Sequence, residues 1–233
     1  MYRAFRWLGP IALVAAVPVT RADGPTSPGD RFKALIEELK ASDQRFDEEY
    51  KAAKTDEERT KATDASLDRR AAIARKMIAV AETAPADPAT AAALVLAFQI
   101  TGPGPEKQKA LDLILKDHIT SDRLAPICPT LVYTMPDDDR ALRIILEKNP
   151  HHDVRGNACF SLARVLKARA DRGGANTRHD LDEAERLFER TAREFADVKR
   201  LGWRLDQRLG FAAENELFDI RHLSVGKTAP EIE

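Results

Sequence analysis

Two cysteines are the residues of this chain best suited to covalent chemistry. Cys128 and Cys159 lie 31 positions apart, in two different predicted helices. In an oxidising compartment they could form a disulfide, and closing a loop of that length would stabilise the fold by about 3–4 kcal/mol. Their leucine and alanine neighbours favour the alternative, two buried thiols that behave as small hydrophobic side chains. Neither cysteine belongs to a Cys-x-x-Cys pair or adjoins an obvious cation, so the sequence predicts no redox nucleophile here.

The remaining polar clusters have simpler explanations than catalysis or metal binding. His151-His152-Asp153 lacks a second His/Glu pair at helical spacing, so we interpret it as a loop in which Asp153 caps the next helix. Asp137-Asp138-Asp139 lacks the alternating spacing of a calcium loop and is typical of a helix N-terminus. Gly102-Pro103-Gly104 lacks the lysine of a phosphate loop and indicates a turn. We therefore predict no catalytic residue, no metal site and no cofactor.

An arginine series, Arg200, Arg204 and Arg208, recurs at helical spacing beside Trp203 and could form a basic groove. Asp206 and the acidic helix before it favour a solvated face instead. The whole chain has 37 basic and 38 acidic residues, a formal charge of −1. This balance provides no broad positive field, so we expect no nucleic-acid partner.

Residues 1–22 have the pattern of a secretory signal peptide. Arg3 and Arg6 precede the apolar segment 8–19, and small residues flank Arg21 ahead of a cleavage site after Ala22. The apolar segment is shorter than the roughly 20 residues that span a bilayer, although an uncleaved N-terminal anchor stays open as an alternative. We predict an exported protein, periplasmic or secreted, with no stable membrane insertion after cleavage.

The composition favours helices, because aromatic residues are only 6% and alanine-rich, charged stretches dominate. We predict an all-α fold in which residues 23–29 are a flexible spacer and residues 30–84 form a long helical hairpin. Asp30 is the expected cap of the first helix. Thr55-Asp56-Glu57-Glu58 is a capping box that predicts the start of the second.

Residues 85–222 are predicted to form successive antiparallel helix pairs, an irregular α-solenoid followed by a short extended tail. The pairs fall near 88–118, 121–149 and 153–197, and a further helix is expected over 203–222. No fixed repeat period aligns them. The last pair resembles tetratricopeptide repeats in its alternation of small and large packing residues, which any tight helical hairpin would share; these residues are Ala158, Leu162, Ala163, Leu166, Ala184, Phe188 and Ala192.

The pattern changes over residues 223–233, Leu-Ser-Val-Gly-Lys-Thr-Ala-Pro-Glu-Ile-Glu. This segment resembles the start of a redoxin domain of the alkyl-hydroperoxide-reductase/thiol-specific-antioxidant family, in the thioredoxin-like superfamily. The resemblance rests on the pattern Val/Ile-Gly-x-x-Ala-Pro-x-Phe/Ile, which is matched by Val225, Gly226, Ala229, Pro230 and Ile232. It implies that 223–233 is the start of a truncated redoxin domain whose catalytic cysteine would lie beyond residue 233. No residue of this chain therefore takes the family's catalytic role.

The resemblance implies an exported, non-catalytic helical module that binds or positions a partner for a thiol–disulfide or peroxide-reducing domain. Its expected partner is a protein or peptide on the face of the packed helix pairs. The alternative is a stand-alone periplasmic helical-repeat scaffold with no link to redox chemistry. An enzyme within the helical region is a third, weaker hypothesis, because no convergent set of polar residues supports it. The sequence does not indicate which oligomeric state the protein adopts.

Overall fold

The computed structural model describes residues 27–202 and 207–223, which are helical apart from short connections. Within these residues the β-type pairing is a single isolated bridge between Lys199 and Arg208, and no strand is formed. The all-α prediction is therefore confirmed. The predicted signal peptide, spacer residues 23–26 and the redoxin-like residues 224–233 lie outside the described residues. The helices are α1 (Pro28–Ala52), α2 (Asp56–Thr83), α3 (Thr90–Ile100), α4 (Pro105–Asp117), η1 (Asp122–Leu124), α5 (Ile127–Thr134), α6 (Arg140–Lys148), α7 (His152–Asp171), α8 (Thr177–Glu194), α9 (Leu209–Phe218) and the π-helical turn η2 (Asp219–Leu223).

Capping residues set the ends of the long hairpin, α1 and α2. Ser27 caps α1, because its Oγ accepts a hydrogen bond from the Asp30 backbone N–H at 3.1 Å. The helix therefore begins at Pro28, and the predictions of Asp30 as cap and of a spacer to residue 29 were wrong. The capping box before α2 is confirmed: the Glu58 N–H donates to Thr55 Oγ1 at 3.2 Å, and the Thr55 N–H donates to Glu58 Oε2 at 3.1 Å.

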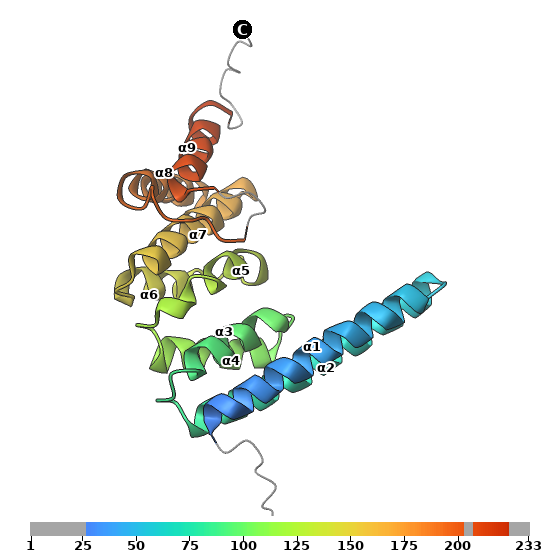
Figure 1. Cartoon of the computed structure of the whole chain (residues 1–233). Coiled ribbons are helices and arrows are strands. Elements are labelled where there is room, and N and C mark those ends of the chain that lie inside the picture. The colour runs from blue at the N-terminus through green and yellow to red at the C-terminus, as the bar shows by residue number, and fades with distance from the viewer. Residues whose placement is uncertain (1–26, 203–206, 224–233) are drawn as a thin grey trace, which may run out of the picture.

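The two halves of the hairpin are held together differently. Near the body of the protein, large buried side chains fill the interface, among them Phe32, Ile73 and Met77. Farther out, ion pairs join the helices, as in Arg70 with Asp43 at 2.8 Å. Figure 1 shows this outer half projecting well clear of the other helices. The distal hairpin is therefore a two-helix arm with both faces available to partners.

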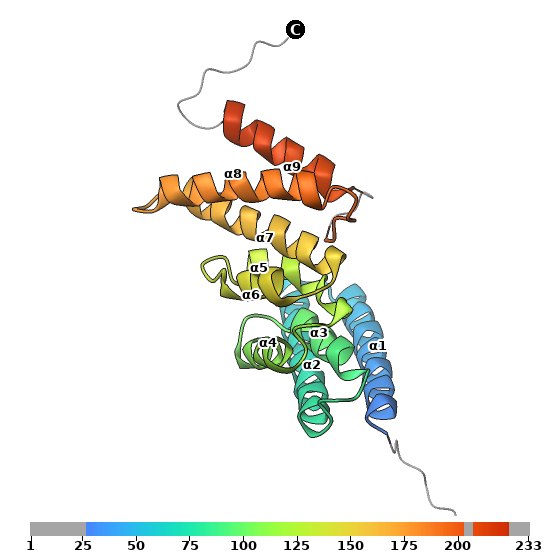
Figure 2. The same ribbon diagram turned by 90° about the vertical axis from the view of Figure 1, so that its left-hand side faces the viewer.

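Three helix pairs follow the hairpin, at the positions expected from the sequence. The first pair is α3 with α4, and the third is α7 with α8, against which α9 packs. The second, η1–α5 with α6, is adjacent in sequence, but α5 and α6 each pack mainly on α7 rather than on each other. Figure 2 shows them stacked one above another. The pairs differ in length, with 11 and 13 residues in the first, 8 and 9 in the second, and 20 and 18 in the third. This inequality explains why no fixed period was found in the sequence.

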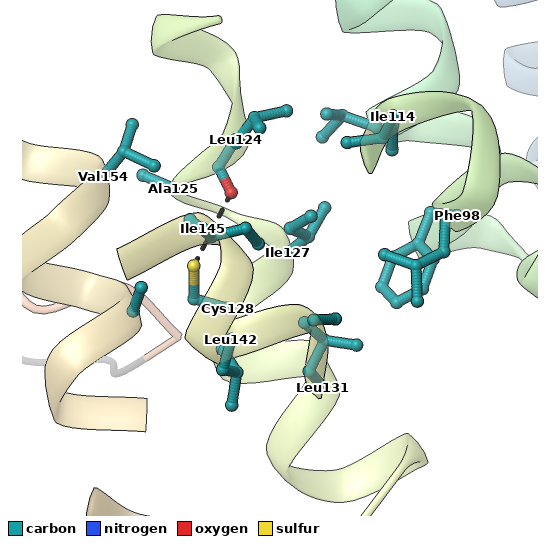
Figure 3. Packing of buried hydrophobic residues seen from close by; sticks show 14 of the residues in the cluster. Phe98, Ile114, Leu124, Ala125, Ile127, Cys128, Leu131, Leu142, Ile145 and Val154 are labelled. Carbon is teal, nitrogen blue, oxygen red and sulfur yellow. Dashed lines mark hydrogen bonds between the residues drawn. The ribbon is translucent and has the colours of Figure 1, made fainter. Parts of the chain in front are cut away.

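One continuous core crosses the boundaries between the pairs. Phe98 of α3 and Ile114 of α4 face Ile127 of α5, which lies beside Ile145 of α6; Val154 of α7 lies on the other side of Ile145 (Figure 3). All five side chains are almost completely buried. Because the pairs share this core, the stack is expected to unfold as a unit rather than pair by pair.

The final helix starts later than the pattern predicted. The prediction was a helix over 203–222; residues 203–206 lie outside the described residues, Gln207 and Arg208 are not helical, and α9 begins at Leu209. Backbone hydrogen bonds across the loop explain the difference: Arg200 N–H donates to Gln207 O at 2.9 Å, and Leu209 N–H donates to Val198 O at 2.8 Å. These backbone groups bond across the loop, so the helical spacing of the arginines was misleading.

Gly210 allows α9 to pack directly against the end of α8. A β-carbon at this position would lie 2.8 Å from Ala196 Cβ and 2.9 Å from Ala196 Cα. We expect Gly210→Ala to lower the free energy of unfolding by about 1–3 kcal/mol, because the helix must shift to relieve the overlap. Urea unfolding measures this loss. Gly29→Ala is the control, since its new methyl would meet nothing closer than 3.8 Å. Equal effects of the two substitutions would contradict the packing argument.

Candidate peptide-binding groove

A groove crosses the helix pairs where α5 meets α3 and the loop after α8. We call it the Tyr133 groove. Its volume is about 370 Å³, within the range of ligand-binding clefts. Eight residues from three segments far apart in the sequence line it: Gln99, Pro126, Pro129, Thr130, Tyr133, Thr134, Leu201 and Gly202. Apolar side chains make up half of this set, and the threonines and glutamine add hydrogen-bonding groups.

The loop that forms one wall of the groove is held in place by Asn157 of α7. The Asn157 amide donates to the Lys199 carbonyl at 3.3 Å, and its oxygen accepts from the Leu201 N–H at 3.2 Å. Gly202 then turns the chain with φ of 77°, a conformation that favours glycine. A β-carbon there would lie 3.1 Å from Pro129 Cβ, so the loop lies directly on α5. Contacts within the chain itself therefore hold this wall in place, and a wall held in this way lowers the entropic cost of binding.

Tyr133 and Arg164 form a cationic–aromatic pair at the edge of the groove. Tyr133 is 67% exposed, the highest value among the exposed large hydrophobic side chains of the described residues. Arg164 Nη2 donates to Tyr133 Oη at 3.2 Å, and the guanidinium carbon lies 5.4 Å from the ring centroid. Arg164 has no carboxylate within ion-pair distance in 27–202 and 207–223. The pair therefore presents an aromatic surface beside a positive charge that no described carboxylate neutralises.

Arg200 adds positive charge beside this pair. Its guanidinium lies 5.0 Å from the centroid of the Phe160 ring, and Nη1 donates to Gln207 Oε1 at 3.2 Å. Burial lowers the pKa of Arg200, and the nearby charge of Arg164 lowers it further. Arg208 does not extend the same face, because it reaches back to the Asp197 carbonyl across the loop. The helical series expected from the sequence is therefore not formed between Arg200 and Arg208, and Arg204 lies outside the described residues.

Both cysteines are buried free thiols. Cys128 donates to the Leu124 carbonyl at 3.8 Å (Figure 3), and Cys159 donates to the Leu187 carbonyl at 3.5 Å. Burial raises the pKa of Cys128 to about 12 and also raises the pKa of Cys159. The disulfide considered from the sequence is therefore not formed in this structure. Neither thiol is suited to nucleophilic attack, since both are kept protonated and out of contact with solvent.

The state of the thiols can be measured directly. We expect the native protein to resist an aromatic disulfide reagent, because both side chains are buried in the core. After unfolding in urea, both Cys128 and Cys159 should react, which can be followed as released thiolate. A denatured protein that titrates no thiol until it is reduced would contradict the structure and restore the disulfide.

The other predicted polar clusters each have structural roles. His151 is the N-cap residue of α7, so Asp153 lies in the first turn rather than capping the helix. The three aspartates before α6 pair with different arginines: Asp137 with Arg172, Asp138 with Arg140, and Asp139 with Arg143. Gly104 precedes α4 at a turn, as expected. The described residues hold no group of three or more acidic, histidine or cysteine side chains that could bind a metal ion.

The Tyr133 groove was not predicted from the sequence, where residues 121–149 were expected only to form the second helix pair. One signal was present: Tyr133 is one of only three tyrosines, and it lies in a short helix whose core positions other residues fill. The contribution of Leu201 and Gly202 required knowledge of the fold, because they lie far from α5 in sequence.

Comparisons with known proteins place this chain in no family. No family model matches the sequence, and neither the curated proteins nor the solved structures include a match. Among the described residues, no helix is long and apolar enough to cross a membrane.

Proposed function

We propose that this chain is a non-catalytic helical interaction module, and that its Tyr133 groove binds an extended peptide segment bearing a carboxylate. The pairing of exposed Tyr133 with Arg164 is the observation that carries the proposal. Tyrosine and arginine are the residue types most enriched at the energetic centres of protein interfaces. An extended segment fits because the groove runs across three chain segments and presents two prolines and a tyrosine, which suit contact with a stretched backbone.

Charge favours an acidic ligand. Arg164 lies within hydrogen-bonding distance of Tyr133 and has no carboxylate partner in the described residues. A ligand carboxylate could accept two hydrogen bonds from the Arg164 N–H groups that do not bond to Tyr133, and the guanidinium would keep its contact with the Tyr133 ring. A positively charged segment would meet repulsion at the same place.

Alanine substitution at the pair tests the proposal. Peptides selected from a random phage-displayed library against the full chain should carry an acidic residue, and their affinity can be measured by calorimetry. We expect Tyr133→Ala and Arg164→Gln each to weaken binding by about tenfold or more, since each removes a central contact. Tyr50→Ala is the matched control, because Tyr50 is also exposed but lies on the distant hairpin. Peptides that bind both tyrosine variants equally would contradict a site at this groove.

The outer face of α9 supports a position next to another folded domain. Phe211 and Phe218 are 57% and 50% exposed, and their seven-residue spacing places them on one face of the helix. The Phe218 ring also contacts His222, with ring centroids 4.8 Å apart. Terminal units of helical solenoids normally present a polar outer face to water. An apolar face directly before the segment that resembles the start of a redoxin domain is consistent with that domain packing here.

We therefore extend the proposal: the module belongs to an exported protein in which it positions a redoxin domain. The intact mass of the protein isolated from its source tests this extension. Removal of residues 1–22 from the 25.9 kDa chain would leave about 23–24 kDa, and the expected result is a mass about 15 kDa above that, the size of one small domain. A mass near or below 25.9 kDa would contradict the redoxin link and leave the groove proposal to its own test.

A further inference from the structure

The projecting arm of α1 and α2 carries a second groove, which shares no residue with the Tyr133 groove. We call it the tip groove. Its volume is about 600 Å³, and it lies at the end of the hairpin remote from α3, between the last turns of α1 and the first turns of α2. Because this half of the hairpin projects clear of the body (Figure 1), a ligand can lie along it without meeting the other helices.

Alanines form the floor of the tip groove. Ala52 and Ala53 come from the end of α1, and Ala62 and Ala65 from the facing turns of α2. Two helices packed on each other lie 8–10 Å apart, with the distance set by the side chains at the contact. A floor without large side chains allows a third helix to approach closely and to place its own leucine or phenylalanine side chains between the two helices. The shape therefore suits an amphipathic helix better than an extended strand.

The rim of the tip groove has an excess of positive charge. Four cationic side chains and two carboxylates line it: Arg45, Lys54, Lys61, Arg69, Glu49 and Glu58. Glu49 already accepts hydrogen bonds from Arg45 at 2.7 Å and from Arg69 at 2.9 Å. Glu58 accepts from the backbone N–H groups of Lys54 and Thr55, in the capping box. Both carboxylates are therefore already hydrogen-bonded to groups of the hairpin itself.

The ammonium groups of Lys54 and Lys61 have no ion-pair partner among the described residues. They flank the alanine floor on the side of the hairpin opposite Tyr50 and Asp64, which line a separate depression. A ligand that complements this side must combine an apolar stripe with carboxylates at its edges. We propose that the tip groove binds an acidic amphipathic helix of a partner protein, which would complete a three-helix bundle with α1 and α2.

Selection against the full chain, with charge-reversed protein as a competitor, tests this site. A phage-displayed library of helical peptides of about 18 residues, five turns in length, is selected on the full chain in the presence of excess Lys54→Glu/Lys61→Glu protein. The selected peptide is then synthesised, and its affinity is measured by fluorescence anisotropy. We expect acidic residues beside a leucine stripe, and a loss of about tenfold or more in affinity for the double variant. Added salt should weaken binding, since the attraction is between exposed charges.

Two further variants separate the site from general charge effects. Lys33→Glu/Lys116→Glu makes the same change in net charge on exposed lysines away from the groove, and it should bind the peptide normally. Ala62→Glu places a carboxylate on the floor and should abolish binding, while circular dichroism verifies that the helices persist. Tyr133→Ala should leave this peptide's affinity unchanged, so failure here is distinguishable from failure at the Tyr133 groove.

Three results would overturn the proposal. One is that selection on the tip groove yields no peptide, or yields peptides without an acidic excess. Another is that the Lys33/Lys116 variant weakens binding as much as the Lys54/Lys61 variant. The third is that the full chain associates with itself and loses this association in Ala62→Glu, which would make a second copy of the chain the occupant.

Discussion

Replacing Asp180 with asparagine is expected to lower the free energy of unfolding by about 3 kcal/mol, because it breaks an ion pair at a buried position. Asp180 is 3% exposed and accepts two hydrogen bonds from Arg169, at 2.7 and 2.8 Å. The pair joins α7 to the first turn of α8. Without the carboxylate, Arg169 keeps only a longer contact with Asp139, at 3.6 Å, and remains partly desolvated.

The surrounding network explains why this pair matters more than the many ion pairs at the surface. Arg143 of α6 donates to Glu183 of α8 at 2.6 Å and to Asp139 at 3.1 Å, so one set of charges ties three helices together. Urea unfolding at neutral pH measures the loss. Asp122→Asn is the control, because Asp122 is 64% exposed and its pairing with Arg123 spans 3.6 Å. Similar losses for both aspartates would contradict the argument from burial.

Acid should remove the difference between the wild type and Asp180→Asn. The hydrogen bonds from Arg169 lower the pKa of Asp180 below its usual value of 3.8. A carboxyl whose pKa is lowered in the folded state stabilises the fold above 3.8 and loses this contribution as the pH falls through the folded pKa. The gap in unfolding free energy is therefore expected to be full at neutral pH and to close in strong acid. A gap that is constant with pH would show that packing, not charge, causes it.

Lys107→Ala is expected to lower the free energy of unfolding by about 3 kcal/mol, comparable to truncating a buried hydrophobic side chain. Lys107 of α4 is 1% exposed, an unusual position for lysine. Its ammonium donates to the Phe98 carbonyl in the last turn of α3 and lies 4.1 Å from the centroid of the Phe98 ring. The carbonyl end of the α3 dipole and the face of the ring partly offset the loss of hydration. Alanine would leave a cavity, and the Phe98 carbonyl would keep only the longer hydrogen bond from Thr101 Oγ1, at 3.4 Å.

Alkaline pH distinguishes the charge from the packing of Lys107. Burial lowers its pKa from the usual 10.5, so between the folded pKa and 10.5 the unfolded chain binds more protons than the folded one. Stability due to this residue therefore rises with pH across that interval. Lys107→Met keeps most of the packing and removes the titration, so the wild type should gain stability relative to it as the pH rises toward 10.5.

Lys116→Ala serves as the control for both Lys107 measurements, because Lys116 is 77% exposed and lies in the same helix. Its effect on the free energy of unfolding is expected to stay within about 0.5 kcal/mol. A parallel pH profile for the wild type and Lys107→Met would contradict the lowered pKa. A loss in Lys107→Ala no larger than in Lys116→Ala would contradict the buried position itself.

Local signals predicted the helices well, because they act over a few residues. The capping box at Thr55 and the change from long to short helices both depend on neighbours within one turn, and the structure confirms them. Two errors were local, because Ser27 rather than Asp30 caps α1 and His151 rather than Asp153 is the N-cap residue of α7. Another arose where tertiary contacts override local spacing. In the segment expected to be helical from residue 203, the described residues are helical only from Leu209, since Val198 and Arg200 bond through their backbones to Leu209 and Gln207, and Gly202 lies against Pro129.

The positions of Lys107 and Asp180 show a second limit of the sequence. Lysine and aspartate are ordinarily surface residues, and nothing in their immediate neighbourhood marks these two as buried. Asp180 pairs with Arg169, from the preceding helix, and the Lys107 ammonium donates to a carbonyl at the end of α3. Both partners are close in sequence, but only the angle between packed helices brings the groups together. The same reasoning applies to the Tyr133 groove, whose walls come from three separate segments.

Amide chemical-shift mapping tests the central claim, binding at the Tyr133 groove, most directly. The isotope-labelled full chain is titrated with the acidic peptide selected on the groove, and the shifts of its backbone amides are followed. We expect the largest changes at Gln99, Thr130, Tyr133, Arg164 and Gly202, and no such pattern in Tyr133→Ala. Changes centred on another surface, or an unaltered response in Tyr133→Ala, would contradict it.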